Sequence, residues 1–400
     1  MSSEKGLNPS SIGRENVEMI FQLIQRAGEI TRTEISSSSG LSKTAISSSV
    51  TQLLDKDLIL EDKHRRYSKV GRKPRLLSIN PEGRHFISID IGGTKVTYGL
   101  GNLTGELLDT ETKTTPDHWE KLYEDILNHV RNSSEWSSEG FSQIDGVAIA
   151  VPGVVNENGT VHYAPNIEGL DRVQLRQELG QVLDIPIFLE NDVNASALGE
   201  YQKRKSVYTD IVFIAIGTGI GAGIINDGEL FTGFSNHAGE VGWLVSDVDY
   251  METKKNGKKG WLESRISGPD IVRRAKQKLE NNLEDPLSDY ESGLNPKVIL
   301  QNELDSPVAG ELIEDWIKVV SMLISNITNI VDPQLVVLGG GVSKTGGEYI
   351  EEVRHRVARN TQRTPEIELT LLGDKAPIYG GFAVCRKNIS EFIWENGSRA

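Results

Sequence analysis

Apolar and polar positions alternate at helical spacing through the first part of the chain. Between residues 14 and 27 apolar side chains recur every three or four positions, which predicts a helix with one buried face that ends at Gly28. The stretch TRTEISSSSG predicts a second, short helix stopped by Gly40, and a third helix follows with Ser42 as its N-cap. Two short helices joined in this way form a helix-turn-helix. The positions expected to face inward are Val17, Ile20, Phe21 and Ile24 in the first helix and Ile46, Val50, Leu53 and Leu54 in the third.

The outward face of the third helix and the segment behind it carry candidate contacts to nucleic acid. Two apolar runs in LILEDKHRRYSKVGRKPRLLSIN flank a basic loop, which is the pattern of a β-hairpin wing. Residues 63–75 hold seven Lys or Arg and no acidic residue, which favours contacts with DNA phosphates. A solvated loop and a protein-docking module are the alternatives. The candidate DNA-binding residues are Lys43, Thr44, Ser47 and Ser48 on the helix and Arg72, Lys73 and Arg75 on the wing.

From residue 86 the pattern changes to pairs of strands bent at glycines. HFISIDIGGTKVTYGLGN predicts a strand, a glycine turn and a second strand, and IVFIAIGTGIGAGIINDGEL repeats that form. Backbone N–H groups at such turns can approach an anion, and Asp90 is placed to hold Mg²⁺ or its water shell. Neither turn matches the lysine-bearing P-loop or the Rossmann fingerprint. Taken alone, a glycine-bearing β-turn is usually just a turn, and the second glycine loop is what favours phosphate binding. The candidate phosphate-binding residues are Asp90, Gly92, Gly93, Thr94, Lys95, Gly217, Thr218, Gly219 and Gly221, and a third cluster of Gly339, Gly340 and Gly341 follows another predicted strand.

Between the two turns lies IPIFLENDVNASALGE, a predicted buried strand that ends in polar residues before a helix. A carboxylate at a strand end can accept the proton of a substrate hydroxyl during phosphoryl transfer, and Asp192 is the candidate base. A second interpretation is that Asp192 or Asn194 only caps the helix. The local sequence leaves both interpretations open.

Length, charge and cysteine content limit the class of protein. Four hundred residues predict two or three domains, and no stretch approaches the roughly 18 apolar residues of a membrane helix. The N-terminal residues lack the apolar core of a signal peptide, and the single Cys385 cannot form an internal disulfide, so we expect a cytoplasmic protein with no membrane partner. The net charge of −14 is uneven: residues 1–85 hold 14 Lys and Arg against 10 Asp and Glu, and the remainder holds 29 against 47. Any binding to a polyanion therefore belongs to the front segment.

The order of the motifs resembles that of one family. SKTAISSSVTQLLDKDLI and GRKPRLL resemble the DNA-binding domain of ROK (repressor, open reading frame, kinase) repressors of the NagC/XylR type. DIGGTK, AVPGVV, APNIEGL, ENDVNASALGE, IGTGIGAGII, HAGEVG and VLGGGV then follow in the order of ROK sugar kinases and repressors. The resemblance implies an α/β, actin-like (ribonuclease-H-like) two-lobed fold preceded by a winged helix-turn-helix. The expected domains are a DNA-binding domain over residues 1–82, a smaller lobe over 83–205 and 378–400, and a larger lobe over 206–377.

The same resemblance implies roles for individual residues. Asp192 would be the catalytic base, and the third glycine cluster, residues 339–341, would lie on the adenosine side of ATP. The residues implied to bind the sugar are Asn191, Asp192, Glu240 and Glu263, with Asn166 as a further candidate. On its own, each glutamate could equally be a surface carboxylate.

One part of the family pattern is missing. Many ROK proteins carry a histidine and a cysteine-rich loop that bind structural zinc, but this chain has Trp243 at the histidine position and Lys254, Asn256 and Trp261 at three cysteine positions. Lysine and tryptophan offer no metal-binding lone pair at neutral pH, so we expect no structural zinc. Apolar packing of the two tryptophans is the expected substitute, with stacking on a sugar ring as the alternative.

Three functions fit these observations. The first is a regulator, expected to be a repressor, that binds a double-stranded DNA operator and senses a sugar or sugar phosphate. The second is an ATP- and Mg²⁺-dependent sugar kinase with a vestigial N-terminal module, and the third is an enzyme that also regulates its own operon. We favour the first, because a complete wing and recognition helix are hard to explain in a kinase. One recognition helix per chain further predicts a homodimer or a dimer of dimers on a two-part operator.

Overall fold

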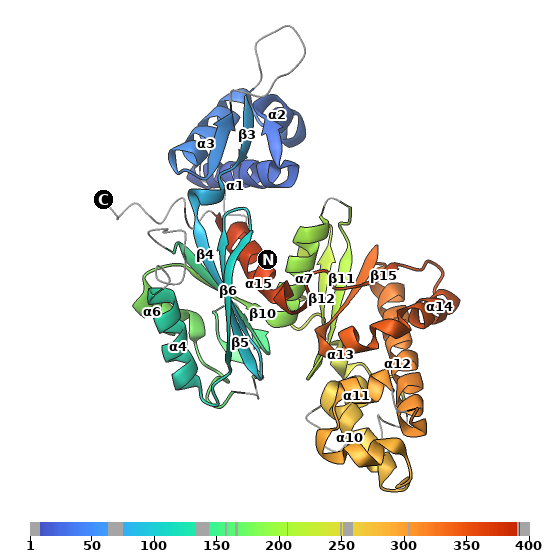
Figure 1. The fold of residues 1–400 in the computed structure, drawn as a ribbon. Coiled ribbons are helices and arrows are strands. Elements are labelled where there is room, and N and C mark those ends of the chain that lie inside the picture. Colours follow the sequence, from blue (N-terminus) through green and yellow to red (C-terminus); the bar gives the residue numbers. More distant parts are fainter. Residues whose placement is uncertain are drawn as a thin grey trace. The chain divides into compact units, whose positions relative to one another are not determined.

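The computed structural model describes residues 9–62, 75–132, 144–156, 158–164, 167–205, 207–248, 250, 259–302, 305–389 and 392. Contacts between residues divide the chain into two units (Figure 1). Unit 1 comprises Met1–Asn191 and Gly381–Ala400, and unit 2 comprises Asp192–Gly380.

The winged helix opens unit 1 and follows the predicted order of elements. It contains α1 (Pro9–Ala27), β1 (Glu29–Thr31), α2 (Arg32–Ser39), α3 (Lys43–Asp55), β2 (Ile59–Asp62) and β3 (Leu76–Ile79). The three strands form an antiparallel sheet in the order β1-β3-β2, so the two apolar runs around the basic loop pair as a hairpin. The inward positions predicted for α1 are all buried, and in α3 only Leu54 is partly exposed, because it lies on the border of the apolar face.

The rest of unit 1 is built around a five-stranded sheet. In the order β10-β7-β4-β5-β6, the strands β4, β5 and β6 are antiparallel neighbours, whereas β7 and β10 run parallel to β4. Helices α4 and α6 pack apolar side chains such as Leu122 and Leu179 against Ile87 and Ile89 of β4. The elements are η1 (Pro81–Gly83), β4 (His85–Ile91), β5 (Lys95–Asn102), β6 (Leu107–Thr114), α4 (Trp119–Arg131), β7 (Gly146–Val151), β8 (Val154–Val155), β9 (Val161–His162), α6 (Leu175–Leu183) and β10 (Ile187–Asn191).

Unit 2 repeats this sheet topology. Its strand order is β13-β12-β11-β14-β15. On one side of the central strand β11 the two pairings are antiparallel, and on the other side the two pairings are parallel, as they are around β4 in unit 1. The strands are β11 (Ile211–Ile216), β12 (Ile220–Asn226), β13 (Glu229–Phe231), β14 (Leu335–Gly339) and β15 (Glu366–Leu369). Two α/β units with the same strand order are what an actin-like fold requires, and the predicted fold class is confirmed.

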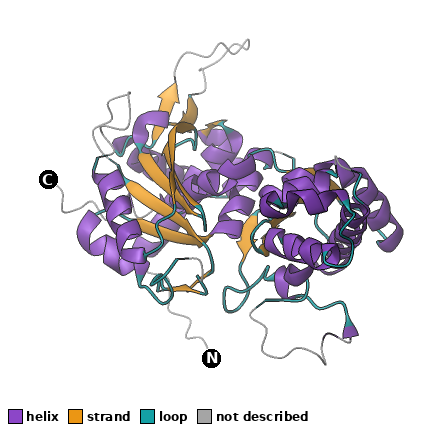
Figure 2. Ribbon diagram, turned by 60° about the horizontal axis from the view of Figure 1, so that its bottom comes forward, coloured by secondary structure: helices purple, strands orange, loops and turns teal. Residues whose placement is uncertain are grey.

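Helices make up most of the remainder of unit 2, and Figure 2 shows them in purple beside the orange strands. These helices include α9 to α14, which share one buried apolar cluster with the sheet, centred on the long helix α12. They are α7 (Asp192–Arg204), η2 (Val241–Trp243), α9 (Glu263–Ile266), α10 (Gly268–Leu279), η3 (Pro286–Gly293), α11 (Pro296–Gln301), α12 (Pro307–Val331), α13 (Gly340–Thr345), η4 (Gly346–Tyr349), α14 (Ile350–Asn360), η5 (Gly373–Lys375) and α15 (Ala376–Lys387), of which α15 continues into unit 1.

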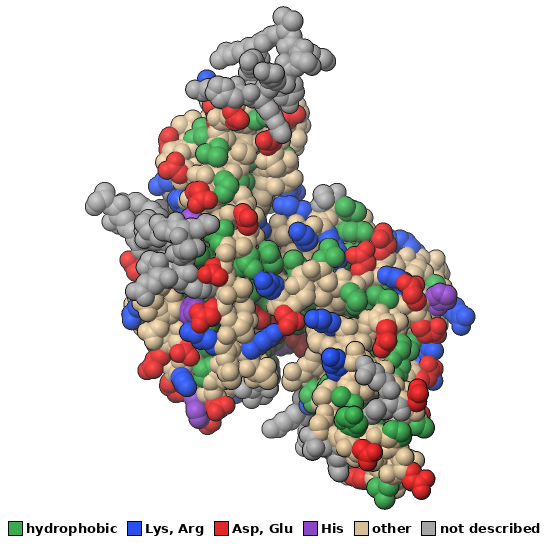
Figure 3. Space-filling model, viewed as in Figure 1, with side chains coloured by type: hydrophobic (Ala, Val, Ile, Leu, Met, Phe, Trp, Pro, Cys, Tyr) green, Lys and Arg blue, Asp and Glu red, His purple; other side chains and the backbone are tan. Residues whose placement is uncertain are grey.

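The face of the molecule drawn in Figure 3 carries charged side chains of both signs. Acidic and basic side chains are interspersed on this face, and hydrophobic side chains lie scattered between them. Among the residues that the structure describes, no helix has both the length and the apolar character to span a bilayer.

Candidate functional site

The two helices of the helix-turn-helix are fixed by local caps. Thr31 and Glu34 form a reciprocal capping box at the start of α2, and Gly40 ends that helix in the left-handed region at φ 68°. At the start of α3 the Ser42 hydroxyl accepts the Ala45 N–H at 3.2 Å. The four side chains proposed to face DNA, at positions 43, 44, 47 and 48, are all exposed. The cap residues and the outward face of α3 are therefore as predicted.

The root of the wing carries an ion-pair triad that the sequence did not reveal. Glu61 of β2 accepts hydrogen bonds from Arg75 at 2.7 Å and from Arg32, the first residue of α2, at 2.9 Å. Partial burial opposes ionisation of Glu61, but the hydrogen bonds from the two arginines lower its pKa overall. Arg75 is thus held at the base of the wing with half of its side chain exposed. Arg72 and Lys73 lie outside the described residues.

The first glycine turn joins β4 to β5 in unit 1. The Gly92 N–H donates to the Lys95 carbonyl at 3.0 Å, and Thr115 braces the turn through its hydroxyl, which donates to the Gly92 carbonyl at 2.6 Å. A side chain at Gly92 would place its Cβ 2.9 Å from the Lys95 carbonyl oxygen, so the tight turn requires glycine. Gly93, Thr94 and Lys95 are exposed at the tip, while Asp90 is half-buried near the end of β4.

Asn191 ends β10 and is the last residue of the first segment of unit 1. Its side-chain amide donates to the Gly153 carbonyl at 2.8 Å, which holds the amide against the loop that follows β7. Asn166, the other asparagine implied to bind sugar, lies outside the described residues.

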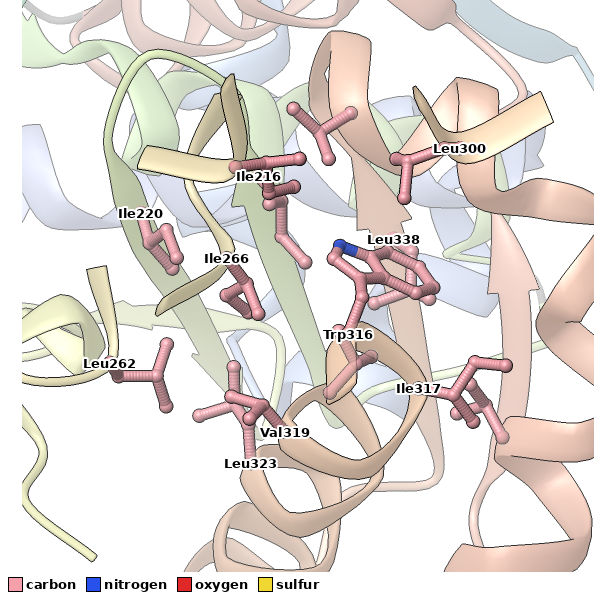
Figure 4. Packing of buried hydrophobic residues seen from close by; sticks show 14 of the residues in the cluster. Ile216, Ile220, Leu262, Ile266, Leu300, Trp316, Ile317, Val319, Leu323 and Leu338 are labelled. Carbon is pink, nitrogen blue, oxygen red and sulfur yellow. The ribbon is translucent and has the colours of Figure 1, made fainter. Parts of the chain in front are cut away.

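The second and third glycine clusters lie next to each other in unit 2. Gly217 follows β11, and its carbonyl accepts the N–H of Gly268 at 2.8 Å. Gly340 adopts φ 84°, and a Cβ there would lie 2.4 Å from the Ile216 carbonyl oxygen, so the turn after β14 abuts the end of β11. Below both turns, Trp316 of α12 packs with Ile216 and Leu338 in the core (Figure 4). A single apolar core therefore supports both glycine clusters.

Glu263 lies beside the second glycine turn. The Ile220 N–H donates to its carboxylate. The carboxylate oxygen Oε2 lies 3.4 Å from the position of a Cβ on Gly219 and 3.3 Å from that of a Cβ on Gly242. Burial raises the pKa of Glu263, and the Ile220 N–H and Lys259 only partly oppose that effect.

Glu240 lies at the start of η2, in a loop that is attached to β12. Gly239, at φ 89°, approaches Ala222 so closely that its carbonyl accepts the Ala222 N–H at 2.7 Å. The pKa of Glu240 is raised, first by burial and then by the charge of Glu263, while His237 acts in the opposite direction. Glu240 nevertheless keeps an exposed surface. Two carboxylates that resist ionisation thus lie near each other and near a glycine turn.

Asp192 is the first residue of α7. Its carboxylate accepts the N–H of Val193 at 2.9 Å, and the side chain of Val193 lies 3.1 Å from the position of a Cβ on Gly221. The first turn of α7 therefore packs on β12, directly after the second glycine turn. Asn194 is buried inside the first turn of the helix, so of the two residues considered as caps only Asp192 occupies a terminal position.

The loop between η2 and α9 contains the positions where the zinc pattern is missing. Trp261 is 7% exposed, as apolar packing predicts, whereas Trp243 is 48% exposed, so the prediction of packing is wrong for Trp243. The difference arises because Trp261 joins the main core of unit 2 and Trp243 ends a surface 3₁₀ turn. Lys254 and Asn256 lie outside the described residues. In the part of the chain that the structure describes, no three His, Cys, Asp or Glu side chains gather as a metal site would require.

Asp270 was missed by the sequence analysis. It is 5% exposed and accepts hydrogen bonds from Ser267, Lys259 and Arg273. The sequence contained one signal, the Ser-x-x-Asp pattern of Ser267 and Asp270 at the start of α10, which predicts a capping box. The structure instead directs the aspartate toward two basic side chains.

Comparison with known proteins found a matching family model for each of the two parts of the chain. The model of the ROK family matches residues 86–388, and a model described as winged helix-turn-helix DNA-binding matches residues 14–59. A xylose repressor of Caldicellulosiruptor bescii is 28% identical over 397 residues, which cover 96% of this chain and 98% of that protein.

Solved structures have the same fold. A crystal structure of a ROK family transcriptional regulator, described as a homolog of the Escherichia coli MLC protein, has a TM-score of 0.81 at 22% identity and covers 96% of this chain and 98% of the other. A ROK family glucokinase from Streptomyces griseus, in complex with glucose and AMPPNP, has a TM-score of 0.63 at 28% identity and covers 74% of this chain and 97% of its own.

Proposed function

The chain belongs to the ROK family, and we propose that it is a sugar-responsive, DNA-binding transcriptional repressor. The observation that carries the proposal is the joint presence of a complete helix-turn-helix, with an exposed polar face on α3, and a ROK domain with two carboxylates of raised pKa beside a glycine turn. The similarity to a xylose repressor along nearly the whole chain supports this combination.

The sugar is bound by hydrogen bonds from polar side chains. Glu240 and Glu263 accept hydrogen bonds from sugar hydroxyls. A carboxylate held in a partly desolvated loop forms stronger hydrogen bonds than one in water. Asn191, Asp192 and Asn166 complete the set of sugar contacts. D-xylose is the first candidate effector, from the name of the repressor relative, and D-glucose is the second, from the glucokinase complex.

The glycine turns fit a nucleotide. Gly217 and Gly341 face open space where a Cβ would meet no atom within 4 Å, so their backbone can approach a phosphate group. In our proposal Gly217, Thr218, Gly219 and Gly221, together with the turn of Gly92, Gly93, Thr94 and Lys95, hold the phosphates of ATP, Asp90 holds Mg²⁺ through water, and residues 339–341 lie on the adenosine side. When bound, ATP would supply a phosphoryl group for transfer.

DNA is bound by α3 and the wing, and the repressor acts in the cytoplasm. Lys43, Thr44, Ser47 and Ser48 contact base edges in the major groove, and Arg72, Lys73 and Arg75 contact phosphates. Because each chain contributes one recognition helix, a homodimer or a dimer of dimers binds the two halves of the operator.

The proposal is tested with the purified full-length protein. Selection from random double-stranded DNA should yield a two-part operator, and fluorescence anisotropy should then show that D-xylose or D-glucose weakens operator binding by about tenfold or more. Replacing Lys43 by Ala should change the preferred DNA sequence. Replacing Arg75 by Ala should weaken binding to all DNA sequences alike and reduce the salt dependence of the affinity. Failure to select any sequence would refute the proposal.

A second candidate function is a sugar kinase, favoured by the intact second glycine turn next to the helix that begins with Asp192. In a kinase, Asp192→Asn should lower sugar-dependent ADP release by orders of magnitude and leave sugar binding nearly unchanged. In a sensor, wild type should release no ADP above background, and the same variant should change only sugar affinity. ADP release by wild type that is lost in Asp192→Asn would make this chain a kinase first.

A further inference from the structure

The turn that carries Glu263 is held by one buried carboxylate. Asp270 accepts hydrogen bonds through Oδ2 from Lys259 at 3.0 Å and from Ser267 at 2.8 Å, and through Oδ1 from Arg273 at 3.1 Å. It is 5% exposed, so these three side chains provide much of the environment of its charge. They are spread over fifteen residues of chain, and α9 lies between the first two.

These contacts fix α9 from both sides. Lys259 precedes the helix and Ser267 follows it, so Asp270 ties together the two ends of the segment 260–266. Arg273 adds a third tie, because its guanidinium also donates to the Ser264 carbonyl at 3.3 Å. At the front of the segment, Gly260 packs against Gly242 so closely that a Cβ would lie 2.0 Å from the Gly242 carbonyl oxygen. Glu263 is therefore fixed relative to the loop that carries Glu240.

The charges of the cluster favour a stable set of contacts around Asp270. A buried carboxylate is costly unless it is paired and hydrogen-bonded, and here two cations and a hydroxyl share it. Burial opposes its ionisation, yet the hydrogen bonds from Lys259, Ser267 and Arg273 lower the pKa of Asp270 overall. Lys259 and Arg273 are each about half exposed, so either ion pair alone would contribute little, and the shared buried carboxylate makes the group a unit.

We propose that Asp270 is a positioning residue for Glu263, and that its cluster with Lys259, Ser267 and Arg273 ties the two ends of segment 260–266 together without a metal ion. The residues of this chain do not fit zinc, because Trp261 occupies a ligand position and is buried in the core. In place of a metal ion, the Asp270 carboxylate is the common point that Lys259, Ser267 and Arg273 contact. The proposal rests on the sugar-binding role of Glu263 given above.

The first measurement needs no sugar. Hydrogen–deuterium exchange of the full-length protein should show residues 260–266 exchanging roughly tenfold faster in Asp270→Asn than in wild type, with other regions unchanged. Lys259→Met removes one tie and should give a smaller increase in the same residues. Glu311→Gln is the matched control, because it removes an ion pair with Lys278 at the other end of α10. Unchanged exchange in both test variants would overturn the proposal.

The second measurement uses D-xylose and D-glucose as probes, with binding followed by titration calorimetry. Asp270→Asn should weaken binding about tenfold, as loss of a supporting residue does at other sites. If Asp270 acts through Glu263, the double variant with Glu263→Gln should bind no more weakly than Glu263→Gln alone. Additive losses would overturn the route through Glu263. If neither sugar binds wild type, the proposed effector fails, and the exchange measurement alone decides the role of Asp270.

Discussion

At the scale of single residues, Glu240 and Glu263 are held where their negative charge is unfavourable. Burial is the largest cause for both, and the charge of Glu263 adds to it at Glu240. A raised pKa means that the folded state binds the proton more tightly than the unfolded state does. The contribution of such a group to stability is therefore fully present below its ordinary pKa of 4.5 and is lost as the pH rises through the folded value. The direction of the two shifts means that protonation of these carboxylates favours the folded state.

We therefore predict that replacing Glu240 has opposite effects on stability and on sugar affinity. Glu240→Gln removes a desolvated charge, so without sugar the melting temperature at pH 7 should stay the same or rise. The same change should weaken binding of the effector about tenfold or more, because a hydrogen bond to a charged acceptor is lost. Differential scanning calorimetry and sugar titration measure the two effects. A variant that loses stability and keeps its sugar affinity would contradict the assignment.

The pH dependence of sugar binding follows from the same cause. As the pH falls through the raised pKa of Glu240, the carboxylate is protonated and becomes a poorer acceptor, so wild type should bind sugar more weakly in mild acid. Glu240→Gln should show a flatter profile, since one of the titrating groups is gone. Sugar titrations from pH 7 down through the acid range in which carboxylates are protonated provide the comparison, and a profile unchanged by the substitution would exclude Glu240 as the titrating group.

The residues that sequence predicted well are those whose role depends on near neighbours. Gly40 and Ser42 were assigned correctly because a helix end requires a left-handed residue or a side-chain acceptor within three positions. Glu61 was missed because its partners Arg32 and Arg75 lie outside its strand. Asp270 was missed because its local partners Ser267 and Arg273 predict only a helix start, and the tie to Lys259 depends on how the chain folds back before α9. The exposure of Trp243 could not be predicted either, since it depends on which tryptophan joins the core of unit 2.

At the scale of elements, two glycines provide a matched test of helix geometry in the winged helix. Gly13 lies inside α1 and Gly40 ends α2, and a Cβ would meet no atom within 4 Å at either position. Only the backbone differs, because Gly40 has φ 68°. Gly13→Ala should stabilise the winged helix by about 0.5–1 kcal/mol, and Gly40→Ala should destabilise it by about 1 kcal/mol. Native-state hydrogen exchange of α1 to α3 measures both, and changes of the same sign would contradict the explanation.

The pairs of strands around the glycine turns were the elements most readily predicted. β4 with β5 and β11 with β12 are antiparallel neighbours joined by short turns, so residues close in sequence determine them. The parallel pairings of β4 with β7 and of β11 with β14 join strands that are far apart in the chain. Periodicity cannot fix such pairings, and the common topology of the two sheets was expected only through the actin-like fold that the family resemblance implied. The start of α1 at Pro9 was also missed, because residues 9–13 lack the apolar spacing of the later turns.

At the scale of the whole molecule, the charge is divided between the two functions. Residues 1–85 carry a net charge of +4 and the remainder carries −18, so the ROK domain is repelled by DNA at a distance and the winged helix is attracted to it. On the face drawn in Figure 3, acidic and basic side chains are mixed. Operator binding should therefore depend on few phosphate contacts per chain and on their number in the assembled oligomer.

A repressor that responds to sugar must couple two sites in one chain, and that coupling is reciprocal. If the sugar lowers operator affinity by a given factor, bound operator must lower sugar affinity by the same factor, because both describe one thermodynamic cycle. We expect a factor of about ten or more, measured once by titrating operator with and without saturating sugar and once by titrating sugar with and without saturating operator. Glu263→Gln should weaken sugar binding and leave the affinity of the sugar-free protein for operator unchanged, because Glu263 lies outside the winged helix. Equal operator affinity in the presence and absence of saturating sugar would show that the two sites are uncoupled and that this chain is not a sugar-controlled repressor.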